Sequence, residues 1–309
     1  MARSEVGAGA LQPAILALVA MLFVVSPNLL YALDIPYSSS RGPKWAKIHP
    51  AFYVVVAMLV IVTCRRNSRG RTAVQPASLA LAGTALLAML VVTLSSTTGS
   101  GGGELSALVV TFLLPALFAL VMSHSTPRTL DTLPIVLTVI FAMNSITAIV
   151  ESLSGVRLLP FVAGDAILTF DKRPTALLGH PLTNATLTGA WVLVFAMHLF
   201  QARLRALPVF ICALHLLALV AFGGRVALAV TLVLVAIYVV SHTLARLAHG
   251  GGGREILRLS VLFLLVGAVA LAGWWTGLAD LIIARFGDGR GSNETRLAAL
   301  QMLSGLEVS

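Results

Sequence analysis

Residues 221–228, Ala-Phe-Gly-Gly-Arg-Val-Ala-Leu, connect two apolar runs at 207–222 and 226–240. Glycine lets the backbone turn sharply, so the Gly223-Gly224 pair predicts a tight hairpin between two membrane helices. A guanidinium at such a bend costs at least ~2.5 kcal/mol near the bilayer centre, and less toward the interface, unless an anion compensates its charge. Arg225 is therefore the leading functional residue. The competing interpretation is that Arg225 only snorkels to the lipid headgroups.

The composition indicates a membrane protein. Of the 309 residues, 58% are hydrophobic and 11% are charged, whereas soluble domains carry about 25% charged residues. Cys64 and Cys212 lie in apolar stretches and are expected to be buried hydrophobes. His198 and His215 have no second ligand at metal spacing, so we predict helix-packing hydrogen bonds, no metal site and no cofactor.

The apolar runs predict an all-α, polytopic transmembrane bundle of about nine spans, since about 20 apolar residues cross a bilayer. The predicted spans are 12–33, 50–64, 77–96, 105–123, 133–150, 181–200, 207–222, 226–240 and 259–279. We therefore expect a transmembrane domain over 1–279 and the start of a large outer loop over 280–309. The first run lacks a small-x-small cleavage site, which favours a retained helix.

Lys and Arg in the connections predict the orientation. With the N-terminus inside, the inner connections hold 11 of these residues in 56 positions, and the outer connections hold 10 in 87. This density favours an inside N-terminus and an outside C-terminal segment. The total charge of +9 is spread over both membrane faces, so it does not indicate nucleic-acid binding.

The predicted outer side still carries several basic residues that can face an anion. They are Arg157, Lys172, Arg173, Arg225, Arg285, Arg290 and Arg296. A lipid diphosphate fits them, because guanidinium groups bind phosphate oxygens bidentately. We take Arg173 and Arg290 as candidate substrate-binding residues beside Arg225. Headgroup anchoring is the open alternative for each of the seven.

The segment Gly179-His180-Pro181-Leu182-Thr183-Asn184 predicts the start of the sixth span, because proline is favoured at the first position of a helix. His180 would lie at the cap and Asn184 one turn later on the same side. Both side chains are expected to face the outer leaflet, where they could bind a sugar or a diphosphate. Ordinary helix capping is the alternative.

The last segment combines a glycine-rich half, from Arg285, with a helix that Ser292 or Asn293 can cap. Its apolar side consists of Leu297, Leu300 and Leu303. Arg296 would lie in the first turn of this helix, from where it could face the membrane surface near Arg225.

Three motifs together resemble the bacterial O-antigen ligase and polymerase superfamily, which includes exopolysaccharide polymerases. They are His180-Pro-Leu-Thr-Asn184, Gly223-Gly-Arg225-Val-Ala-Leu and Ser292-Asn-Glu-Thr-Arg296-Leu, in the same order and topology over most of the chain. The resemblance implies a multi-pass protein of the bacterial inner membrane. It also implies a metal-independent glycosyltransferase that moves glycan from a polyprenyl-diphosphate donor to a saccharide acceptor.

By position, Arg225 and Arg296 resemble the two arginines of this family that would hold the donor diphosphate and stabilise charge on the leaving group. The family continues through an outer loop with a proposed catalytic histidine and then through further helices. Here no histidine follows His249 and the chain stops at Ser309. We therefore expect a C-terminally truncated member. The general base stays unassigned, and so does the activity of the chain as it stands.

Two other functions remain open. A transporter or flippase for a lipid-linked glycan is one, although coupled carriers usually place charged residues at mid-membrane. The predicted spans hold only His198, His215 and the polar Asn144 there. The other is a non-catalytic partner of other polysaccharide assembly proteins in an export complex.

Overall fold

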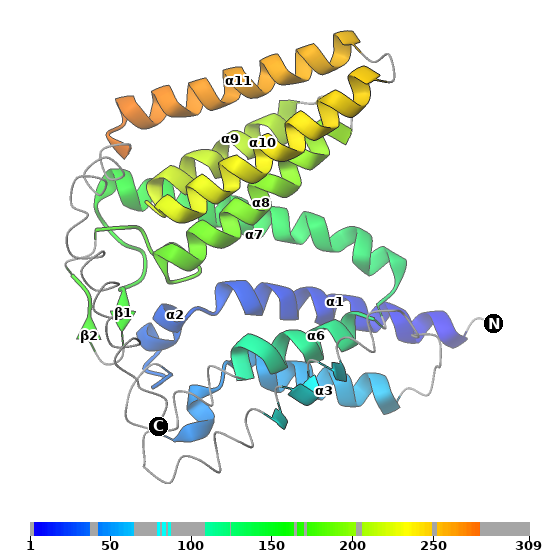
Figure 1. Ribbon diagram of the computed structural model, residues 1–309. Coiled ribbons are helices and arrows are strands. Elements are labelled where there is room, and N and C mark those ends of the chain that lie inside the picture. The colour runs from blue at the N-terminus through cyan, green and yellow to red at the C-terminus, as the bar shows by residue number, and fades with distance from the viewer. Residues whose placement is uncertain are drawn as a thin grey trace, which may run out of the picture. The chain divides into compact units, whose positions relative to one another are not determined.

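The structure is a computed structural model that is largely helical (Figure 1). It describes residues 3–37, 43–64, 79–80, 82–84, 86–87, 109–123, 125–163, 166–169, 172–201, 206–248 and 252–278. The chain forms two compact units. Unit 1 comprises Met1–Asn144, Leu158–Asp171 and Leu177–Gly179, and unit 2 comprises Ser145–Arg157, Lys172–Ala176 and His180–Ser309.

Unit 1 contains the N-terminal helices and a short antiparallel strand pair. Its elements are α1 (Arg3–Val24), α2 (Pro27–Ala32), the 3-10 helix η1 (Lys44–Lys47), α3 (Pro50–Cys64), the π-helix η2 (Val109–Leu113), α6 (Leu114–Met122), β1 (Val162–Ala163) and β2 (Ala166–Ile167). Helix α7 (Pro127–Ser154) contributes its residues through Asn144.

The first apolar run is two helices, which corrects the prediction of a single span over 12–33. Helix α1 ends at Val24, and α2 begins at Pro27. Proline disfavours helical geometry in the residue before it, and Ser26 is accordingly extended, with φ −84° and ψ 161°. Its hydroxyl accepts a hydrogen bond from Leu29 N, so Ser26 is also the N-cap of the new helix.

Apolar side chains and one histidine hold α1, α3 and α6 together in unit 1. The buried cluster consists of Ile15, Leu18, Ala51, Val55, Met58, Leu114 and Val121. Beside it, His49 Nε2 lies 2.7 Å from the carbonyl oxygen of Val25, and Ala51 N donates to His49 Nδ1 at 3.2 Å. A carbonyl only accepts and an amide only donates. His49 is therefore a neutral ring with its hydrogen on Nε2.

Two buried asparagines bind loop backbone in unit 1. Asn28 Nδ2 donates to Gly179 O at 2.7 Å, and Asn28 Oδ1 accepts from Val162 N at 3.3 Å. Asn144 Oδ1 accepts from Leu177 N at 3.0 Å. These bonds satisfy backbone groups that have no strand or helix partner there.

Unit 2 is a series of helical hairpins that follows the last residues of α7. Its helices are α8 (Pro181–Gln201), α9 (Ala206–Ala221), α10 (Arg225–Ala248) and α11 (Gly252–Trp275). Helix α8 packs against both α9 and α10, and α11 packs on α9 and α10 (Figure 1). The short connections make consecutive helices antiparallel, so α8 and α10 are parallel to each other.

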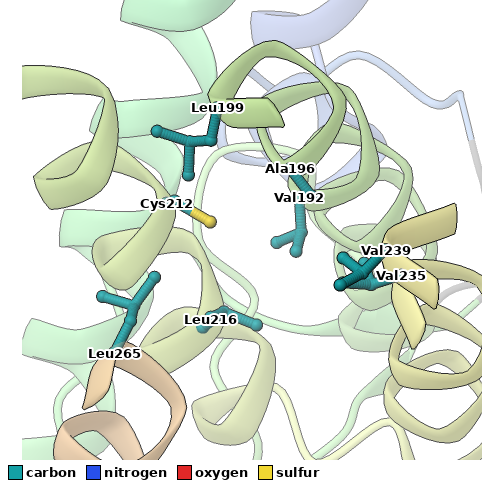
Figure 2. Packing of buried hydrophobic residues seen from close by; sticks show 8 residues of the cluster. All are labelled: Val192, Ala196, Leu199, Cys212, Leu216, Val235, Val239 and Leu265. Atoms are coloured by element: carbon teal, nitrogen blue, oxygen red, sulfur yellow. The ribbon is translucent and has the colours of Figure 1, made fainter. Parts of the chain in front are cut away.

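The core of unit 2 lies between these four helices and consists mainly of aliphatic side chains (Figure 2). Helix α8 contributes Val192, Ala196 and Leu199. They face Cys212 and Leu216 of α9, Val235 and Val239 of α10, and Leu265 of α11. Cys212 is a buried free thiol, as the sequence predicted for an apolar run.

Within the described residues, four helices are long and apolar enough to cross a membrane, as expected for the predicted helical membrane protein. They are Pro127–Ser154, Pro181–Leu199, Arg225–Arg246 and Ile256–Trp275. The shorter apolar helices are Gln12–Val24, Pro50–Val62, Val109–Met122 and Ala206–Ala221. Most of the predicted span 77–96 lies outside the described residues. About nine spans, the inside N-terminus and the outside C-terminal segment stay predictions.

Acidification should loosen unit 1 through His49. Burial lowers the pKa of His49, although its hydrogen bond to Val25 acts in the opposite direction. The unfolded chain therefore binds the proton more readily, so this stability is present above about pH 6.5 and is lost as the pH falls through the folded-state pKa. Thermal unfolding at pH 7 and pH 5 should show a smaller pH dependence in His49→Gln than in wild type. The exposed His180 supplies the control His180→Gln, and an equal change in both variants would contradict the assignment.

Candidate functional site

A tight turn presents Arg225 at the start of α10. Gly223 has φ +63°, a conformation that favours glycine, and Phe222 before it is fully buried. Leu228 N donates to Gly224 O at 2.8 Å, so Gly224 caps the helix and Arg225 is its first residue. The Arg225 side chain is half-buried. The hairpin predicted from the glycine pair is therefore confirmed.

Close contact between the parallel helices α8 and α10 fixes the position of this turn. A Cβ atom added to Gly224 would lie 2.5 Å from the Cβ of Ala185. Two turns further along α10, the side chain of Thr231 occupies the place that a Cβ of Gly189 would need. Small residues four apart on α8 thus let the two backbones approach, as small-residue motifs do in membrane helices.

The α8 helix begins at Pro181 as predicted, but its two candidate residues point into different surroundings. His180 is exposed, and its Nδ1 accepts from Leu182 N at 3.2 Å, so it caps the helix. Asn184 is fully buried, and its Nδ2 donates to Thr175 O at 2.7 Å. The expectation that both side chains face the outer leaflet is therefore not met. Asn184 instead turns inward to bind backbone.

A buried carboxylate organises the segment that carries Arg173. Glu151 Oε2 accepts from Thr175 N at 2.8 Å and from Ala176 N at 2.9 Å. Ala176 is in the left-handed region, with φ +42°, so this bend requires such fixed partners. Just before it, Arg157 Nη2 donates to Arg173 O at 3.1 Å. Arg173 is half-buried, and Lys172 beside it is exposed.

These contacts gather positive charge at one end of unit 2, which we call the Arg225 end. Its basic residues are Arg157, Lys172, Arg173 and Arg225, with the cap residue His180. In the described part of unit 2, the carboxylate at this end is Glu151, which is buried and bonded to backbone. Helix α11 returns to the same end, where Trp274 is 67% and Trp275 is 82% exposed. Exposed tryptophans are typical of a membrane interface.

Two polar residues of α7 hold backbone groups in a way that was not predicted from the sequence. Glu151 was overlooked, although a lone carboxylate at the end of a long apolar helix is an available signal. Asn144, a polar exception within its predicted span, is buried and accepts a hydrogen bond from the backbone N–H of Leu177. The hydrogen bond expected of His215 is present, with its Nδ1 2.8 Å from Ser145 Oγ.

The remaining candidate residues, Arg285, Arg290 and Arg296, lie outside the described residues, as does the helix predicted after Ser292. Their proximity to Arg225 stays a prediction. Within the described ranges, no group of three His, Cys, Asp or Glu side chains could hold a metal ion.

The packing of Gly224 predicts that Gly224→Ala destabilises the protein by about 1–3 kcal/mol, because the added methyl overlaps Ala185. Gly267→Ala in α11 is the control, since a Cβ there meets nothing within 4 Å. Thermal unfolding in detergent is measured for both variants and for wild type. Equal stability of Gly224→Ala and wild type would mean that the two helices do not touch in this way.

Glu151→Ala should destabilise unit 2, because two buried N–H groups lose their acceptor at about 1–3 kcal/mol for each unsatisfied group. Glu151→Gln keeps an acceptor oxygen and should cost less. Hydrogen exchange at the Thr175 and Ala176 amides, with the exposed Lys172→Ala as control, reports the loss. Unchanged exchange rates in Glu151→Ala would contradict the assigned bonds.

No family model, curated protein or solved structure matches this chain.

Proposed function

We propose that this chain is a polysaccharide biosynthesis protein of the bacterial inner membrane that binds a polyprenyl-diphosphate-linked glycan at the Arg225 end of unit 2. The observation that carries the proposal is a half-buried arginine at the first residue of a helix long enough to cross a membrane. The positive end of a helix dipole favours anions. An anionic ligand would therefore be attracted both by this helix end and by the Arg225 guanidinium.

The surroundings of Arg225 support a diphosphate as that anion. Helices α8 and α10 both begin at this end and lie next to each other, so two positive dipole ends are adjacent. The C-termini of α7 and α9 oppose this field in part. The side chains add four cationic groups against one buried carboxylate that is already bonded to backbone.

The membrane setting supports a lipid carrier of that diphosphate. A polyprenyl chain is apolar and would lie along the lipid-exposed helix faces, while its diphosphate stays at the interface. Exposed Trp274 and Trp275 are suited to that interface. The arginine at the helix start also corresponds to the motif that resembles O-antigen ligases and polymerases.

In the proposed reaction, a hydroxyl of the saccharide acceptor attacks the anomeric carbon of the donor glycan. The bond from that carbon to the diphosphate oxygen breaks, and the lipid diphosphate leaves with the bonding electrons. The hydroxyl proton passes to a base or to water. Arg225, with Arg296 as its proposed partner, would stabilise the negative charge that grows on the diphosphate. Arg173, Arg290 and His180 are proposed to assist binding, whereas Asn184 would act by holding Thr175.

A flippase for the same lipid-linked glycan is the second candidate. The observation that favours it is the buried Ser145–His215 pair, because polar groups inside a helical bundle often mark a solute path. Sugar transfer by the protein in detergent would support the transferase, and movement of labelled lipid across vesicles without transfer would support the flippase.

The proposal predicts that Arg225→Ala weakens binding of a polyprenyl diphosphate by about tenfold or more, since a charge-assisted pair contributes about 1.5–3 kcal/mol. Arg225→Lys should recover only part of the affinity, because an ammonium group does not bind two oxygens in the same fork. Binding of the polyprenyl diphosphate to the protein in nanodiscs is measured for each variant and compared with binding of the uncharged polyprenol.

The matched control is Arg246→Ala, which removes an exposed arginine near the opposite end of the same helix. It should bind the diphosphate as wild type does. If Arg225→Ala keeps wild-type affinity, or Arg246→Ala loses as much, the proposed anion site is wrong.

A further inference from the structure

Three helices of unit 2 meet at a buried layer to which each contributes an alanine, beside Leu219 and Phe222 of the same cluster. Ala148 of α7, Ala185 of α8 and Ala218 of α9 are buried in one cluster, and each has no exposed surface. Glu151 and Asn184 both bind the segment around Thr175, so α7 runs toward the Arg225 end while α8 runs away from it. Helix α9 runs toward that end, since it leads into the Gly223-Gly224 turn.

One helical turn deeper than this layer, the same three helices carry polar residues. Three residues along each helix, about 4.5 Å, lead from the alanines to Ser145, Thr188 and His215. All three have no exposed surface, and Ser145 Oγ lies 2.8 Å from His215 Nδ1. The ring of Phe195 lies against that of His215, with the two ring centroids 5.7 Å apart.

Three buried polar atoms at and above this level have no partner among the described protein groups. They are His215 Nε2, Thr188 Oγ1 and Asn184 Oδ1. Asn184 and Thr188 are four residues apart, so they lie on one face of α8. Buried polar atoms in proteins are nearly always hydrogen-bonded to protein or to ordered water, and leaving one unsatisfied is costly.

The surroundings of these atoms toward the Arg225 end are otherwise apolar. The buried cluster at the Arg225 end of the layer combines the three alanines with Leu219 and Phe222, and the three polar atoms come from two different helices. A buried water needs little volume and two to four polar partners, and these side chains carry such partners. Apolar lipid could not satisfy the same atoms.

We propose that α7, α8 and α9 enclose a hydrated polar site, in which bound water joins His215 Nε2, Thr188 Oγ1 and Asn184 Oδ1. The site runs from the Ser145–His215 pair toward the Arg225 end of unit 2. Its ligand is water, and it does not depend on the proposed glycan chemistry. Because hydroxyl and imidazole groups both donate and accept, the network gives the His215 ring a route for exchange of its proton with solvent.

Water-to-methyl magnetisation transfer tests the site directly. Protein in nanodiscs is labelled at threonine and valine methyl groups, and transfer from water is followed at Thr188 and Val192. Both residues are on α8 and are almost completely buried, but Val192 belongs to the aliphatic core. Transfer to Thr188 should build up several times faster than transfer to Val192. Equal rates would overturn the proposal.

Thr188→Val supplies a second, independent measurement. If water binds the Thr188 hydroxyl, the variant loses that bond and its melting temperature falls. If the site is dry, removing an unsatisfied hydroxyl leaves the melting temperature unchanged or raises it, which would overturn the proposal. The exposed Thr186→Val, on the opposite face of the same helix, is the control and should melt as wild type does.

Discussion

Backbone polar groups near a membrane must find partners inside the protein, and this constraint governs how both units of the chain are built. Where the chain leaves its helices, buried side chains supply those partners. Asn28 and Asn144 do so in unit 1, and Glu151 and Asn184 do so in unit 2. The loops are thereby held in single conformations. The basic residues that they carry, Arg173 among them, are positioned by the same bonds.

The sequence was a good guide to the helices, because apolar runs, glycines and prolines act locally. The hairpin at Gly223-Gly224 and the helix start at Pro181 were predicted where the structure has them. The error over 12–33 came from weighing hydrophobicity above Ser26-Pro27, which ends one helix and caps the next. The destination of each buried polar side chain was not predictable, since Asn28 and Gly179 are 151 residues apart.

The candidate site illustrates the same division between local and long-range information. Arg225 was identified because a charge beside a glycine turn is visible in the sequence. Asn184 was predicted to bind a ligand because a polar residue one turn into a helix is usually accessible. In the structure its amide instead donates a hydrogen bond to Thr175 O. The pairing of Ser145 with His215 joins residues 70 positions apart, so the sequence indicated a hydrogen bond without its partner.

The contacts of Gly224 with Ala185 and of Thr231 with Gly189 have a mechanical consequence. Helices that pack this closely cannot slide past or rotate about one another without collision, so α8 and α10 form one rigid pair. Any rearrangement within unit 2 would then leave this pair intact and involve α9, α11 or the end of α7, which lie outside it. Arg225, at the end of this rigid pair, would then keep its position while the other helices of unit 2 move.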